Sequence, residues 1–165
     1  MTAATGPMSL SSRSGLVAAI AGGTLAGAID LTYATSFHGL VNHIAPIRIL
    51  QSIASGLFGV ASFQMGYASA AAGFAAHFII LIVAAGIFGF ARRRIAFLRE
   101  HAYPAGMAFG VAIYCTMNYV VLPLSAAPHF KSAPVAAISD FAVHVLLLGP
   151  AISLVAKQFD RRVAS

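Results

Sequence analysis

Charged side chains are scarce in this sequence. Only 8% of its 165 residues are Asp, Glu, Lys or Arg, whereas about a quarter are charged in an ordinary soluble domain. Hydrophobic residues make up 59% of the chain, and its mean hydropathy is +0.87. No polar stretch is long enough to form a separate soluble domain, so the composition indicates a single unit embedded in a membrane.

The motifs of soluble enzymes are also missing. The chain contains no GxSxG, no Walker lysine loop, no HExxH and no CxxC. Its single cysteine, Cys115, permits neither an intramolecular disulfide nor a cysteine-based metal site. Gly22, Gly23 and Gly27 lie inside an apolar run, so they do not form a dinucleotide-binding loop. We therefore expect no enzymatic activity, no cofactor and no bound metal.

Four long apolar stretches fill most of the chain, at residues 15–37, 68–91, 104–124 and 135–156. Each can cross a hydrocarbon core of about 30 Å as a helix of roughly 20 residues. The sequence therefore predicts an all-α bundle of four transmembrane helices over residues 15–157. We expect a disordered N-terminal tail at residues 1–14 and a basic C-terminal tail at residues 158–165.

The segment 46–62 differs from these four stretches. Pro46 suits a first helical turn, and polar and small residues then recur at steps of three and four, an amphipathic pattern. Its polar stripe comprises Arg48, Ser52, Ser55, Gly59 and Ser62. The pattern favours an interfacial or re-entrant helix. Leu50, Ile53 and Leu57 are expected to face acyl chains or the bundle, and Arg48, Ser52 and Ser55 to face headgroups or water. A fifth span is the alternative.

The basic residues gather at predicted helix ends, as the positive-inside rule requires. With four spans and an internal N-terminus, eight of the ten Lys and Arg residues lie inside and two, Arg48 and Lys131, outside. With five spans Arg48 and Arg13 exchange sides, and the count stays the same. We expect a multi-pass protein with both termini in the cytoplasm. Because no basic face with interleaved aromatics exists, we do not expect nucleic-acid binding. We do expect the basic residues to be weakly attracted to anionic lipid headgroups.

Polar residues interrupt the predicted spans at similar depth in the membrane. At 1.5 Å per helical residue, they fall in the middle and outer half of the bilayer. This predicted polar cluster consists of Asp30, His77, Asn118, Asp140 and His144. Small residues precede several of its members at steps of four, which allows close approach of helices. An aspartate facing lipid costs about 2.5–3.5 kcal/mol at mid-helix, so the cluster is expected to face the bundle interior.

Three readings of this cluster remain open. It could handle protons or a small solute inside the membrane. Alternatively, the protein is a structural or accessory subunit whose polar residues only hold helices together or bind a partner. Haem ligation by His77 and His144 is a third reading. Beyond the lipid bilayer, the sequence leaves a homo-oligomer and a membrane-protein partner equally open.

Residues 68–162 resemble the YagU-type group of small bacterial inner-membrane proteins. The resemblance rests on these features: His77-Phe78-Ile79-Ile80, Gly106-x3-Gly110, Pro123-Leu124 followed by Pro128, Asp140-x3-His144, and Arg161-Arg162. Before residue 68 the amphipathic segment has no counterpart in that group, and Asn118 stands near where a histidine is expected. The resemblance implies a bacterial inner membrane and four spans, and it supplies no activity and no catalytic residues.

Overall fold

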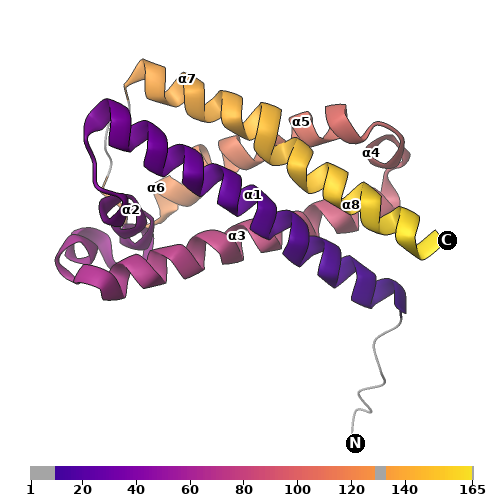
Figure 1. Cartoon of the computed structure of the whole chain (residues 1–165), viewed down its shortest axis with the longest axis horizontal. Coiled ribbons are helices and arrows are strands. Elements are labelled where there is room, and N and C mark those ends of the chain that lie inside the picture. Colours follow the sequence, from indigo (N-terminus) through magenta and orange to yellow (C-terminus); the bar gives the residue numbers. More distant parts are fainter. Residues whose placement is uncertain (1–9, 129–132, 165) are drawn as a thin grey trace, which may run out of the picture.

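Helices account for nearly all of the structure, a computed structural model that describes residues 10–128 and 133–164 (Figure 1). The α-helices are α1 (Leu10–Asn42), α2 (Pro46–Phe58), α3 (Gly66–Arg94), α4 (Ala96–Glu100), α5 (Ala102–Thr116), α6 (Leu122–Leu124), α7 (Pro134–Val143) and α8 (Gly149–Ala164). A 3₁₀ segment, η1 (Gly59–Gln64), and two π-helical segments, η2 (Met117–Val121) and η3 (His144–Leu148), connect them. The described residues contain no strand, which confirms the expected all-α class.

Five helical stretches are long and apolar enough to cross a membrane. They are Ser14–Asn42, Pro46–Gln64, Gly66–Arg94, Ala102–Leu124 and Pro134–Asp160. All four stretches predicted as spans are among them. The amphipathic segment is also long and apolar enough to be a span. The structure therefore supports a multi-pass membrane protein and is compatible with four spans or five.

The long helices run roughly along the long axis of the molecule, in alternating directions (Figure 1). Helices α1, α3, α5 and the continuous α7–α8 helix run along the long axis, whereas α2 is seen nearly end-on beside α3. The described start of α1 and the described end of α8 lie at the same end of the bundle. Helix α2 lies at the opposite end, with the start of α3.

Parts of both predicted tails are helical. Helix α1 begins at Leu10 and α8 continues to Ala164, so residues 10–14 and 158–164 are helical. Neither segment contains glycine or proline, and a helix need not stop where its apolar run stops. Residues 1–9 and 165, the rest of the predicted tails, lie outside the described part of the chain, as does Lys131 of the predicted outer loop.

Glycines allow the helices to approach at backbone distance. A Cβ atom on Gly23 of α1 would overlap the backbone of Ile82 in α3. On α5, a Cβ on Gly106 would lie 2.6 Å from Cα of Pro150, and one on Gly110 would overlap the carbonyl of His144. The expected close packing along Gly106 and Gly110 is therefore confirmed, and its partners are α8 at Gly106 and η3 at Gly110.

Pro123 and Pro150, the two prolines that lie beyond the first turn of a span, each follow a wide helical turn. Segment η2 ends one residue before Leu122-Pro123, and η3 ends one residue before Gly149-Pro150. Proline has no N–H, and its ring clashes with the carbonyl four residues earlier, so the preceding turn must open. The sequence predicts a kink at Pro150; the structure places a π-helical turn there, beginning at His144.

Polar contacts fix α2 to η1 and to the start of α3. The Gln51 amide donates to the Gly66 carbonyl over 3.0 Å, and the Arg48 guanidinium donates to the Phe63 carbonyl over 2.9 Å. Ser55, expected to face headgroups or water, is instead 2% exposed and donates to the Ser52 carbonyl. That prediction is wrong because a serine can satisfy its hydroxyl within its own helix and pack as a small residue. Leu57 is 67% exposed, as a residue facing acyl chains would be.

The glycine contacts lead to a test of the packing. We expect Gly106→Ala to lower the free energy of unfolding by about 1–3 kcal/mol, because the added methyl group overlaps the backbone at Pro150. Gly89→Ala should leave stability unchanged or slightly higher, since a Cβ there meets nothing within 4 Å. Thermal unfolding of the purified protein in detergent, followed with a thiol-reactive dye on the half-buried Cys115, measures both. Equal effects of the two substitutions would rule out this account of the α5–α8 contact.

Candidate functional site

Four of the five residues of the predicted cluster meet in the structure. Asp30 comes from α1, His77 from α3, Asp140 from α7, and His144 from the first position of η3. We call these four residues the acid–imidazole cluster. Their side chains are shielded, with relative exposures of 18% for Asp30, 11% for His77 and 10% for His144, while Asp140 reaches 37%.

His77 connects α3 to α1. Its Nε2 lies 3.1 Å from the carbonyl oxygen of Gly27 and 3.8 Å from Oδ2 of Asp30. A carbonyl oxygen only accepts, so Nε2 carries the hydrogen and donates it to Gly27. Gly27 suits this position, since a Cβ there would press on the ring of Phe78 at 2.8 Å. The imidazole is thus held beside the carboxylate of Asp30 by a backbone bond.

His144 is held in a similar way. Its Nδ1 lies 2.9 Å from the carbonyl oxygen of Asp140 and 3.4 Å from Oδ1 of the same residue. The carbonyl again requires that the ring nitrogen donate, which leaves Nε2 as the acceptor of a neutral imidazole. On α5, the ring of Tyr114 meets the imidazole edge to face, with centroids 5.6 Å apart.

The two halves of the cluster meet at Asp30. One possible ligand atom from each of Asp30, Asp140 and His144 lies within 4.8 Å of the others. Two ionised carboxylates this close repel each other strongly in a poorly solvated site, so a proton or another cation between them stabilises the arrangement. One imidazole nitrogen and two carboxylate oxygens are also ligands that a divalent metal ion accepts. The sequence prediction of no metal stays a prediction.

Asn118 is not joined to the other four residues. Within the described part of the chain, its amide donates to the Tyr114 carbonyl of its own helix, over 3.0 Å. In a regular α-helix Asn118 would share the face of Gly106, Gly110 and Tyr114, which precede it at steps of four and predicted its place in the cluster. Because η2 begins at Met117, the next turn is wider and that spacing no longer holds.

One pair of hydroxyl groups beside the cluster was not predicted from the sequence. The Tyr33 and Ser139 hydroxyls are 2.6 Å apart and join α1 to α7. Tyr33 follows Asp30 by three residues, and Ser139 immediately precedes Asp140. Their positions beside the two carboxylates were the available signal, but tyrosine and serine are ordinary in apolar helices.

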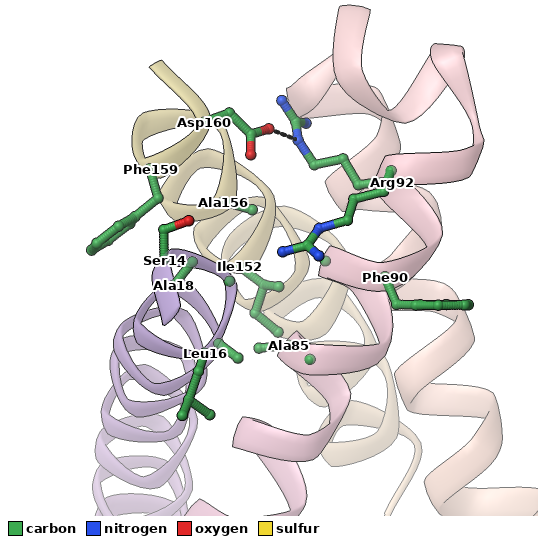
Figure 2. A pocket seen from close by; sticks show the side chains of 15 residues that line it. Ser14, Leu16, Ala18, Ala85, Phe90, Arg92, Ile152, Ala156, Phe159 and Asp160 are labelled. Atoms are coloured by element: carbon green, nitrogen blue, oxygen red, sulfur yellow. Dashed lines mark hydrogen bonds and ion pairs between the residues drawn. The ribbon is translucent and has the colours of Figure 1, made fainter. Parts of the chain in front are cut away.

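A second buried polar group lies at the end of the bundle where α1 begins. Arg92 of α3 is only 4% exposed, and its Nε donates to Oδ2 of Asp160 over 2.7 Å (Figure 2). The same guanidinium donates to the carbonyl oxygens of Leu98 and Arg99. In the sequence, Arg92 is one of the basic residues that gather at predicted helix ends, with no sign that it is buried. Its burial depends on Asp160, which lies 68 residues later and is not visible as a partner in the sequence.

Comparisons with known proteins add no relative, since no protein-family model, curated protein or solved structure matches this chain. The site must therefore be judged by its own geometry.

The position of Asn118 can be tested against that of His144. We expect Asn118→Ala to change the free energy of unfolding by no more than about 0.5 kcal/mol, because its amide bonds only to its own helix. His144→Ala should lower it by about 1–3 kcal/mol, since it removes a buried ring and its contact with Tyr114. Thermal unfolding in detergent measures both changes. A loss of stability for Asn118→Ala as large as that for His144→Ala would show that Asn118 does belong to the cluster.

Proposed function

We propose that this chain is a non-enzymatic multi-pass protein of the bacterial inner membrane whose acid–imidazole cluster takes up and releases protons, alone or together with a small solute. The observation that carries the proposal concerns the carboxylates. Both imidazole N–H groups donate to backbone carbonyls, of Gly27 and Asp140. The carboxylates of Asp30 and Asp140 then lie 3.8 Å and 3.4 Å from the imidazole nitrogens of His77 and His144.

Carboxylates in this position need a partner. An ionisable residue inside a span costs several kcal/mol, so it normally pairs with another group or marks a proton or ion pathway. Two carboxylates beside two imidazoles provide four groups that exchange protons with one another and with water. A shared proton satisfies the carboxylates in one state and is released in the other, which is the elementary step of a relay.

The proposed topology has four spans and an α2 that lies across them. The orientation of α2 across the long helices supports this reading (Figure 1). Arg92, Arg93, Arg94, Arg99 and Lys157 belong to the end where α1 begins and α8 ends. The positive-inside rule assigns that end to the cytoplasm, with both termini.

The rival function is that of a structural or accessory subunit. This function is supported by hydrogen bonds that join helices near the cluster, from His77 to the Gly27 carbonyl and between the Tyr33 and Ser139 hydroxyls. Such bonds contribute about 0.6 kcal/mol each on average in membrane bundles. The haem reading has less support, because the carboxylate of Asp30 lies beside His77 and also beside His144, where an iron would have to bind both rings.

Proton flux in proteoliposomes tests the proposal. We expect the wild-type protein to dissipate an imposed pH gradient, read with an entrapped pH-sensitive dye. Asp30→Asn should reduce the rate at least tenfold, because an amide at this position cannot exchange a proton. His77→Ala should reduce it as well, since its imidazole is the nearest partner of Asp30.

The matched control is Tyr33→Phe, which removes a bond between α1 and α7 and leaves all four titratable groups in place. It should lower thermal stability slightly and keep the flux. If wild-type flux does not exceed that of empty vesicles, or if Tyr33→Phe loses flux as Asp30→Asn does, the polar residues act only to hold helices together.

The topology has its own test. Reporters active only in the cytoplasm, fused at residue 5 and after residue 160, should both be active. Spin labels along 47–62 should report nearly constant mean depth with an oscillation of three to four residues. A periplasmic N-terminus with a cytoplasmic C-terminus, and a steady depth gradient along that segment, would establish five spans.

A further inference from the structure

A cavity of about 280 Å³ lies among the start of α1 and the later turns of α3 and α8 (Figure 2). It lies at the end of the bundle away from α2. Its walls combine arginine and aspartate side chains of α3 and α8 with glycines and small residues of α1 and α3. We propose that this cavity binds the phosphate headgroup of an anionic phospholipid. The proposal is independent of the function of the acid–imidazole cluster.

Positive charge dominates the cavity and its surroundings. Arg92 and Arg93 line it, and Asp160 is the one acidic residue that does so among the described residues. The guanidinium of Arg93 reaches across to α1, where a Cβ on Gly15 would overlap it. A guanidinium carries five N–H donors, so Arg93 can bind a phosphate oxygen in addition to its contacts within the protein. Basic pockets between transmembrane helices are a usual site for lipid headgroups.

The glycines of the α3 wall have no packing role that would explain them. A Cβ on Gly86 would meet only the Ala19 methyl, at 3.8 Å, and a Cβ on Gly89 would meet nothing within 4 Å. This differs from Gly23, where a side chain would overlap a neighbouring helix. Helix α3 therefore leaves open a space beside the arginines that a larger residue could fill without strain.

The size and edges of the cavity match a headgroup and not a whole lipid. Its volume lies at the lower limit of pockets that hold small molecules, about 300–1,000 Å³. Leu16 and Phe90 line it and are 51% and 64% exposed. They lie where the acyl chains of a lipid would leave the cavity along the apolar faces of α1 and α3.

The test compares lipids by thermal unfolding of the full chain in a neutral detergent, followed with the thiol-reactive dye on Cys115. Added phosphatidylglycerol should raise the unfolding midpoint by several degrees, since a ligand that binds only the folded state stabilises it. Phosphatidylcholine and inorganic phosphate at equal concentration should not. Equal stabilisation by inorganic phosphate would show an anion site without lipid, and equal stabilisation by phosphatidylcholine would show no headgroup selection. Either result overturns the proposal.

Three substitutions locate the effect. Arg93→Gln should remove the shift given by phosphatidylglycerol, and Gly89→Leu should remove it without changing any charge. Arg94→Gln is the matched control, because Arg94 lies over the Phe90 ring and is not part of the cavity wall. Co-purified phosphatidylglycerol, measured by mass spectrometry, should fall at least severalfold in Gly89→Leu and persist in Arg94→Gln. If Arg94→Gln loses the shift as Arg93→Gln does, or Gly89→Leu retains it, diffuse surface charge explains the lipid effect and no cavity site exists.

Discussion

Close contact between helix backbones at glycine is the constraint on which this structure depends. Lipid tails are as apolar as leucine, so no hydrophobic effect drives helices together inside a membrane, and packing must supply the attraction. Gly23 brings α1 against α3, while Gly106 and Gly110 bring α5 against Pro150 and His144. The same approach brings a histidine of α3 to a backbone carbonyl of α1. Packing and the polar site are thus set by one geometry, and a bulkier residue at these glycines would disturb both.

Two prolines determine which side chains share a helix face around the site. Pro150 requires an open turn before it, and that turn begins at His144, whose ring nitrogen still donates to the Asp140 carbonyl. The equivalent wide turn before Pro123 begins at Met117. Residues after Met117 therefore no longer follow the regular helical spacing that relates Tyr114 to Gly110 and Gly106. One wide turn therefore begins at a member of the cluster, and the other accounts for the separation of Asn118 from it.

The sequence was sufficient for features that depend on local pattern. Hydropathy located the long helices, and the spacing of small residues identified the faces that carry Asp30, His77, Asp140 and His144. It was insufficient where a residue depends on a distant partner or on irregular backbone. Arg92 is buried because Asp160 and the turn after α3 satisfy its guanidinium. Asn118 required knowledge of a π-helical turn, and Ser55 required knowledge of where α2 meets α3.

The arginine end of the bundle and the acid–imidazole cluster have opposite needs for counter-charge. At the arginine end, basic side chains outnumber acidic ones and a cavity lies open beside them. At the acid–imidazole cluster, two carboxylates lie close together, and the imidazole N–H groups donate hydrogen bonds to backbone carbonyls. Gly15 and Asp30 are separated by fifteen residues of α1, or about 22 Å at 1.5 Å per residue. The cavity and the cluster are therefore separate sites along α1. The His77 hydrogen goes to the Gly27 carbonyl, whereas the His144 Nδ1 that donates to the Asp140 carbonyl also lies 3.4 Å from the carboxylate of that residue. The Asp30 carboxylate, 3.8 Å from the His77 nitrogen, is therefore the member of the cluster left most open to a mobile proton, and the proposed proton uptake depends on it.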